Sequence, residues 1–135
     1  MKYLIRYMVL SLLCIPACSE NPFMPGSVAK NFVHSYFVKE NRDNLLDQVT
    51  GSARVKLSTE KEYSRHLNIP DMEVEIPSGF QLIDSIKIDL NHEQYTFAIL
   101  YPWNISPNET MQVVVEKSSN EWKVSNYRFI RTGEP

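Results

Sequence analysis

The chain has 135 residues and a mass of 15.7 kDa, which is the length of a single domain. Hydrophobic residues make up 43% and charged residues 22% of it, so composition excludes wholesale disorder, collagen-like repetition and a protein with several membrane spans. Two cysteines exclude a disulfide-rich scaffold, and the formal charge of −2 conceals an asymmetry, because the only basic residues of the first seventeen positions precede the first acidic residue.

Residues 1–17 have the three-part layout of a secretory signal peptide. Residues 1–6 are short and basic, residues 7–15 are apolar, and Pro16 and Ala17 supply a helix breaker and a small side chain. The apolar run is about half of the roughly 20 residues that a membrane-spanning helix needs, which disfavours a permanent transmembrane helix. A buried N-terminal core helix is disfavoured because a basic residue precedes the apolar run and a proline follows it.

The end of this segment resembles a bacterial lipobox, in which an aliphatic and a small residue precede an invariant cysteine: the chain reads Ile15-Pro16-Ala17-Cys18. Pro16 departs from the pattern, which usually has a small or β-branched residue there. The resemblance implies cleavage before Cys18, diacylglycerol on its sulfur and an acyl chain such as palmitate on its amino group. Ser19 implies sorting to the outer membrane in a host with two membranes. An ordinary signal-peptidase site is less favoured, because Ile15 is bulky.

Cleavage before Cys18 would leave a mature chain of 118 residues. Removing Lys2 and Arg6 leaves 12 basic against 16 acidic side chains, a formal charge of −4. This charge, together with the lack of a basic stripe, predicts no binding to nucleic acid. Cys14 would be lost with the signal peptide, so the remaining cysteine would be lipidated and no disulfide is expected.

Residues 18–26 contain two prolines and a glycine and are expected to be a tether with a reach of roughly 25 Å. One domain is predicted over residues 27–131, and Ser27 is expected to be the N-cap of its long first helix. Apolar residues recur at spacings of three to five between positions 28 and 37 and fall on one half of a helix. This first helix is therefore predicted to be amphipathic.

Two short helices are expected next. Residues 45–49 predict a second helix that ends at Gly51, where glycine is a natural C-terminal stop. Thr59-Glu60-Lys61-Glu62 fits a capping box for a third helix. Two prolines then bracket residues 73–76, which are predicted to form an edge strand or an extended loop.

From Gly79 the apolar period changes to two, which predicts four strands of about ten residues each. The first strand is expected to place its alternate apolar residues on one face: Phe80, Leu82, Ile86, Ile88 and Leu90. Residues 91–93 are predicted to turn the chain, and residues 118–120 to connect the last two strands tightly. After Val124 the alternation of apolar and polar residues shifts by one position, which predicts a β-bulge near Ser125 and Asn126.

Helices followed by an antiparallel meander define an α+β fold, with the first helix covering one face of a curved sheet. The sequence here resembles the nuclear-transport-factor-2-like (cystatin-like) superfamily, and within it small bacterial lipoproteins of unassigned function. The likeness covers residues 27–130 and is carried by Val-Ala-Lys-Asn-Phe-Val-His-Ser-Tyr-Phe at 28–37 and by Asn-Glu-Trp-Lys-Val at 120–124. It implies a cone-shaped cavity, which different members use for catalysis, ligand storage or protein docking, so the fold does not fix the function.

The one candidate for catalysis is Asp84, a carboxylate in the apolar alternation of the first strand. In a cavity its pKa would be raised and it would act as a general base, unless a bulge or twist near Ser85 turns it to solvent. An aromatic stripe is expected to be core or, if the cavity is open, to line an apolar ligand site together with helix residues and one asparagine. The predicted lining residues are Phe32, Tyr36, Tyr95, Phe97, Tyr101, Trp103, Trp122 and Asn126.

No cofactor or metal is expected, because the three histidines share no ligand spacing and neither a glycine-rich phosphate loop nor a nucleophile elbow occurs. The sequence therefore favours a membrane-anchored envelope lipoprotein that binds an envelope protein or a small apolar ligand without catalysis. Two alternatives stay open. One is a small cavity enzyme of isomerase or hydrolase type that uses Asp84 as base, and the other is a scaffold or inhibitor subunit of an envelope secretion or conjugation machine.

Overall fold

A computed structural model describes residues 21–37, 44–66, 77–103 and 109–132. Two helices come first in the chain, α1 (Pro25–Phe37) and α2 (Gly51–His66). Four strands follow, namely β1 (Gly79–Lys87), β2 (His92–Leu100), β3 (Glu109–Ser118) and β4 (Glu121–Arg131). The predicted signal peptide, Cys18 and the strand or loop predicted at 73–76 lie outside the described residues.

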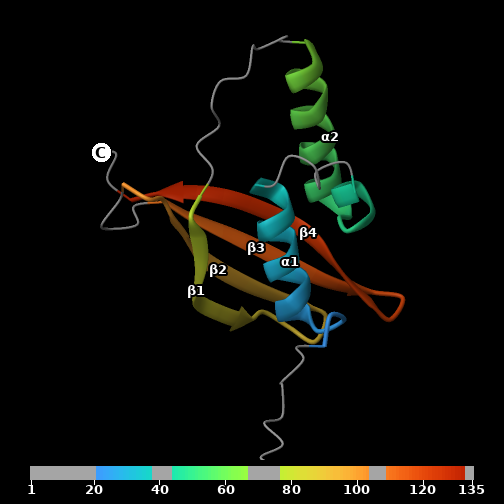
Figure 1. Cartoon of the computed structure of the whole chain (residues 1–135). Helices are drawn as coiled ribbons and strands as arrows, with labels where there is room; N and C mark the ends of the chain where they lie inside the picture. Colours follow the sequence, from blue (N-terminus) through green and yellow to red (C-terminus); the bar gives the residue numbers. More distant parts are fainter. Residues whose placement is uncertain (1–20, 38–43, 67–76, 104–108, 133–135) are drawn as a thin grey trace, which may run out of the picture.

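The strands form one antiparallel sheet in the order β1-β2-β3-β4, and both helices pack on it (Figure 1). Figure 1 shows α1 lying across one face of the curved sheet and α2 standing beside β4. The predicted α+β class with a four-stranded antiparallel meander is therefore confirmed. No helix in the described part of the chain has the length and apolar character needed to cross a membrane.

α1 begins two residues before the predicted N-cap, Ser27, because Pro25 can occupy its first position. Proline suits that position, since its fixed φ fits a helix and its missing N–H would have had no intrahelical partner. The helix therefore takes over the last two residues of the predicted tether (18–26). Its amphipathic character is confirmed by three fully buried side chains on one face: Ala29, Phe32 and Val33.

The prediction of two separate short helices, one ending at Gly51 and one capped at Thr59, is wrong. Residues 44–47 form a short 3₁₀ turn, and α2 then runs without a break for 16 residues. Gly51 starts α2 instead of ending a helix, with a φ of +51° that glycine adopts without a Cβ clash. Thr59 lies inside α2, where its hydroxyl donates to the Val55 carbonyl at 3.0 Å instead of capping a new helix.

The chain just before α2 is fixed by β4, which is why the local pattern did not predict it. Val49 forms a parallel bridge with Val124. The Thr50 N–H donates to the Val124 carbonyl at 2.8 Å, and the Val124 N–H donates to the Gln48 carbonyl at 3.0 Å. These bonds cover the outer edge of β4 and set the point at which α2 starts.

A β-bulge in β4 confirms the one predicted from the shifted alternation of apolar residues after Val124. The pairing of β3 with β4 passes from Val114 with Asn126 to Val115 with Val124, which leaves Ser125 as the extra residue. The connection between these strands is also as expected, because Ser119 and Asn120 have φ values of 50° and 69° and form a two-residue hairpin loop. The turn predicted at 91–93 lies earlier, at residues 88–91.

A second bulge lies in β1, two residues before Ser85, near which the sequence leaves open a bulge or twist as the alternative to a buried Asp84. The register of β1 against β2 shifts between Leu82 and Asp84, which leaves Ile83 as an extra residue. One inserted residue reverses the face of every residue that follows it. The prediction that the apolar residues of this strand share a face is therefore wrong: Phe80 packs against the core, whereas Ile86 points to the opposite face.

The hydrophobic core lies between the helices and the inner face of the sheet. Its largest fully buried side chains come from α1, from the segment before α2 and from β2, β3 and β4, and they are Tyr127, Phe32, Leu45, Ile99, Met111, Val33, Val49, Val113, Val115 and Val124. β1 contributes no buried residue to this set. The sheet is thus well packed on β2, β3 and β4 and leaves β1 largely in solvent.

Candidate functional site

The open edge of β1 is the clearest candidate for a binding surface. β1 is the end strand of the sheet, and among the described residues it pairs with β2 alone. Every residue from Gln81 to Lys87 is exposed. Four large apolar side chains in and just after β1 are about half-exposed: Leu82, Ile83, Ile86 and Ile88. An edge strand with unpaired backbone groups and apolar side chains is a template for another strand.

The backbone pairing of β1 shows which amides point away from the sheet. The Ile88 N–H donates to the His92 carbonyl at 3.0 Å, so it is turned toward β2. Because successive residues of an antiparallel strand direct their N–H and C=O groups to opposite sides, Lys87 and Ser85 direct theirs to the open side. The edge of β4 differs at Val124, since residues 48–50 bond to its backbone there.

Asp84 is exposed on the face of the sheet that is turned away from the helices, beside its pairing partner Thr96. The enzyme alternative requires Asp84 to lie in a pocket within hydrogen-bond reach of a second polar side chain, and this position does not meet that requirement. The physical reason is the extra residue Ile83, which reverses the face of the strand. The bulge that turns Asp84 to solvent thus lies just before it, two residues from Ser85, which agrees with the alternative expected for this strand.

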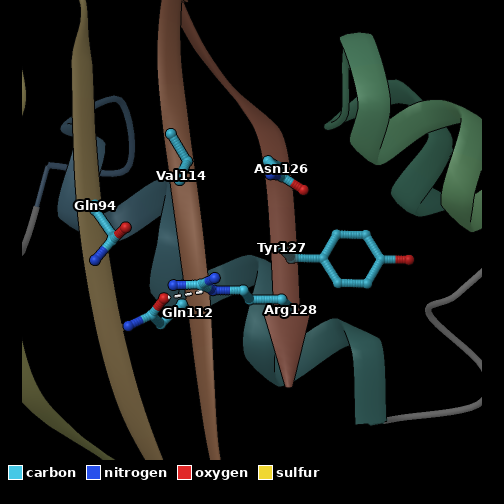
Figure 2. Close-up of a pocket in the computed structure, with 6 residues that line it drawn as sticks. All are labelled: Gln94, Gln112, Val114, Asn126, Tyr127 and Arg128. Carbon is cyan, nitrogen blue, oxygen red and sulfur yellow. Dashed lines mark hydrogen bonds between the residues drawn. The ribbon is translucent and has the colours of Figure 1, made fainter. Parts of the chain in front are cut away.

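A depression of about 110 Å³ lies on this outer face, over β2, β3 and β4 (Figure 2). Its lining is mainly polar and consists of Gln94, Gln112, Val114, Asn126, Tyr127 and Arg128. The Arg128 Nε donates to the Gln112 Oε1 at 2.7 Å. Figure 2 shows the Tyr127 ring pointing away from the other lining side chains. At this volume the depression is well below the roughly 300 Å³ of a typical small-molecule site.

The predicted ligand-lining residues are thus divided between the two faces of the sheet. Asn126 lines the outer depression. Three of the others are buried in the core, namely Phe32, Tyr95 and Phe97. Three more are partly buried and pack against that core, namely Tyr36, Tyr101 and Trp122. The rings of Phe32 and Tyr127, for example, have centroids only 5.1 Å apart, so α1 fills the space above the sheet there.

Trp103 lies outside this core and is 58% exposed. Its ring stacks on Tyr101, with centroids 5.4 Å apart and planes inclined by 24°. The Tyr101 hydroxyl donates to the Glu109 Oε2 at 2.8 Å, which fixes the pair against the start of β3. The structure therefore does not bring Trp103 together with the buried aromatic residues of β2.

One polar cluster was missed in the sequence. The hydroxyls of Tyr36, from α1, and Tyr127, from β4, both donate to Oε2 of Glu60 in α2, at 2.9 and 3.0 Å. Lys56, one turn earlier in α2, lies with its Nζ 4.5 Å from the centroid of the Tyr127 ring and donates to the Tyr127 carbonyl at 3.3 Å. These contacts join both helices to β4.

The chemistry of this cluster is that of a structural junction. Its three polar groups are directed at one another, and the rings of Tyr36 and Tyr127 pack against each other with centroids 5.5 Å apart. The members are 24 and 67 residues apart from Glu60 in sequence, so no local motif could have predicted their meeting. The only available signal was that Lys56 and Glu60 share one face of a helix.

Another tyrosine–carboxylate pair lies at the start of β2. The Tyr95 hydroxyl donates to Oε2 of Glu93. Burial, and next the hydrogen bond to the Glu93 carboxylate, raise the pKa of Tyr95 well above its ordinary value. Nearby, the backbone N–H of Asn91 and then the side chain of His92 lower the pKa of Asp89. The Asp89 carboxylate thus supports the turn between β1 and β2.

Within the described ranges, no three His, Cys, Asp or Glu side chains converge as metal ligands would. Comparison of the chain with protein-family models, with curated proteins and with solved structures finds no match. The function of the chain is therefore inferred from its own residues and their geometry.

Proposed function

We propose that the protein is a lipid-anchored envelope protein whose domain binds another protein, without catalysis, through the open edge of β1. The observation that carries the proposal is the nine-residue strand itself, exposed from Gln81 to Lys87 and paired on one side only among the described residues. The resemblance of residues 15–18 to a lipobox supports an anchor at Cys18, and Ser19 supports placement at the outer membrane.

Strand addition is the binding mode that this edge favours. An extended segment of the partner would pair with the outward backbone groups of residues such as Ser85 and Lys87, which supplies affinity with little demand on sequence. The bulge at Ile83 leaves apolar side chains on both faces of β1, so such a segment would find apolar neighbours above and below its backbone. These side chains would supply the specificity.

A small apolar ligand is less well supported as the occupant. The aromatic residues expected to line its site are largely committed to the core, where Tyr95, Phe97 and Phe32 pack against α1 and the sheet. The outer depression is small and polar. An envelope protein partner therefore fits the described surface better than a hydrophobic small molecule does.

The two other functions differ in what they require. A cavity enzyme would need a base inside a pocket, and Asp84 is exposed. A scaffold or inhibitor subunit of an envelope secretion or conjugation machine is compatible with strand addition at β1, since it too requires a stoichiometric protein partner. We therefore regard the scaffold or inhibitor subunit as a special case of the proposed function. Metal and nucleic acid have no part in the proposal.

We also propose that the domain has the cone-shaped, cystatin-like form of the α+β fold. Two helices on one face of a curved four-stranded sheet are compatible with the cone-shaped, cystatin-like arrangement of nuclear-transport-factor-2-like proteins. The sequence likeness over residues 27–130 is what favours that arrangement over other α+β folds. In members that dock proteins, the fold serves as a rigid scaffold, which is the role proposed here.

A photo-activatable amino acid in place of Ile86 tests the binding edge directly in cells. Val55 in α2 is the matched control position, because it is also a large, exposed aliphatic residue but lies on a helix. We expect a discrete adduct with one other protein from position 86 and none from position 55. Equal adducts from both positions, or none from 86, would contradict the proposal.

A backbone variant shows whether such an adduct depends on strand pairing. Ser85→Pro removes an N–H that faces the open side, where an edge strand tolerates proline. Ser85→Ala keeps that N–H and is its control. The adduct from position 86 is expected to disappear with Ser85→Pro and to persist with Ser85→Ala. Persistence in both variants would show that the partner does not bind by strand addition.

A further inference from the structure

Four exposed apolar side chains lie at the end of the domain where the chain enters α1. Phe23 and Met24 directly precede this helix, and Phe23 is 80% exposed. Ile88 and Leu90 belong to the turn between β1 and β2, and Leu90 is 82% exposed. We call these four residues the apolar tip. Their exposure is unusual because such side chains lose favourable burial free energy in water.

Contacts in the structure place the two halves of the tip at the same end of the molecule. A Cβ atom built on Gly26, in the first turn of α1, would lie 3.4 Å from the Tyr95 ring. The Tyr95 hydroxyl donates to the Glu93 carboxylate. The residue before Glu93 is His92, whose carbonyl accepts the N–H groups of Ile88 and Asp89 in the turn. Figure 1 shows the start of α1 and the β1–β2 turn at the lower end of the view, and α2 rising from the other end.

Most charged side chains next to the apolar tip form ion pairs or hydrogen bonds with neighbouring side chains. Asp89 lies 2.9 Å from Nδ1 of His92, and Nε2 of that histidine lies 3.8 Å from Glu116. Glu93 accepts the Tyr95 hydroxyl. Two basic residues lie close to the turn, Lys87 at the end of β1 and Lys117, whose backbone N–H donates to the Asn91 carbonyl at 2.8 Å. Among the described residues near the turn, Asp89, Glu93 and Glu116 outnumber these two lysines, so there is no net positive charge that would attract anionic lipid headgroups.

The length of chain between the tip and the proposed anchor limits where the tip can lie. Phe23 follows Cys18 by five residues, which span at most about 17 Å even when fully extended. The headgroup layer of one leaflet is itself about 5–8 Å thick. Acyl chains on Cys18 would thus hold the tip within a short distance of the membrane surface, so a lipid surface is the occupant that the chain itself brings to these side chains.

We propose that the apolar tip, formed by Phe23, Met24, Ile88 and Leu90, inserts into the headgroup–acyl boundary of the membrane that holds the anchor. The inference rests on the proposed lipidation of Cys18 and adds to it a fixed orientation of the domain. The β1–β2 turn faces the membrane and α2 points away from it. Insertion is driven by apolar burial, so it needs neither anionic lipid nor low salt.

Depth-dependent quenching tests this orientation on the full acylated protein. A fluorescent label is attached to Leu90→Cys or, as the control, to Tyr63→Cys near the far end of α2, and each protein is reconstituted in phosphatidylcholine vesicles. The acylated sulfur of Cys18 does not react with the label. The label at 90 is expected to shift to the blue and to be quenched by bromine atoms on the lipid acyl chains, at low and at high salt. The label at 63 is expected to show neither effect.

A companion variant separates insertion from an effect of the label. Phe23→Ser with Met24→Ser, in the protein labelled at 90, is expected to lower the ratio of inserted to uninserted protein on the order of tenfold, because two apolar side chains no longer partition into lipid. If the acylated protein floats with the vesicles while labels at 90 and 63 behave alike, or if this variant changes nothing, the orientation is wrong. A chain that carries no acyl group and does not float overturns the anchor and the orientation together.

Discussion

The Tyr127 hydroxyl donates to Oε2 of Glu60 at 3.0 Å, and this bond joins the bulged last strand to α2. The same oxygen accepts the Tyr36 hydroxyl at 2.9 Å, which adds α1 to the junction. The aromatic rings around it are in contact, with the centroids of Tyr36 and Phe129 5.6 Å apart. The junction therefore combines hydrogen bonds to a carboxylate with close aromatic packing, and both should contribute to stability.

Tyr127→Phe tests the polar part of this junction. Phenylalanine keeps the buried ring and removes the hydroxyl, so we expect a loss of about 1.5–3 kcal/mol in the free energy of unfolding, as for a hydrogen bond to a charged group. Tyr63→Phe, on the exposed surface of α2, is the matched control and should change stability by less than about 0.5 kcal/mol. Chemical denaturation followed by circular dichroism measures both. Equal effects of the two variants would show that the Glu60 bonds contribute nothing.

Gly51→Ala tests the start of α2. Gly51 has a φ of +51°, and a Cβ in that left-handed region costs about 1 kcal/mol, so the variant should be less stable by about that amount. Gly26→Ala is its control, because the new Cβ would make an ordinary contact with the Tyr95 ring at 3.4 Å. Thermal unfolding should show a lower midpoint for Gly51→Ala alone. A midpoint unchanged by Gly51→Ala would contradict the assigned backbone conformation.

Tyr95 predicts a dependence of stability on alkaline pH. Its pKa in the folded protein lies above the ordinary value of 10.0, so between those two values the folded state holds a proton that the unfolded state releases. By linkage, the free energy of unfolding then falls as pH rises above about 10, and is unaffected by this group at lower pH. Tyr95→Phe should make the unfolding midpoint less sensitive to pH in that range. An identical alkaline slope in both proteins would contradict the raised pKa.

Ile86→Lys tests whether β1 is an exposed edge. The side chain is about half-exposed and lies outside the core, so stability should change by less than about 0.5 kcal/mol. A lysine on an edge strand should, however, block strand addition and lower self-association. Sedimentation and chemical denaturation of the variant and the natural protein report the two effects separately. A large loss of stability would show that β1 is covered in the folded protein.

The sequence predicted the fold class, the meander and the β4 bulge because each leaves a local periodic signal. The parity shift after Val124 is readable because β4 has one buried and one exposed face. β1 gives no such signal. It is exposed on both faces, so Ile83 and Ile86 are apolar without being buried, and the bulge between Leu82 and Asp84 could not be located.

Tertiary contacts account for the other errors. Among the side chains of α2 that the structure describes, only Ala53 and Leu57 are buried, so the periodicity of this helix is too weak to predict its full length. Its first residues are fixed by hydrogen bonds between the preceding segment and Val124, more than seventy residues away in sequence. The Glu60 junction likewise depends on residues from three separate elements. The sequence left both a pocket and a solvent-exposed position open for Asp84, because the exact position of the β1 bulge gives no local signal.

The mass of the N-terminal tryptic peptide that ends at Lys30, isolated from membranes of a host that processes lipoproteins, shows directly whether Cys18 carries the lipid anchor. The account predicts a peptide that begins at Cys18 and carries a diacylglyceryl group with a further acyl chain, and it predicts that Cys18→Ser abolishes this modification whereas Cys14→Ser does not. A peptide with an unmodified Cys18, or one that still includes residues before Cys18, would contradict the anchor on which the location of the protein depends.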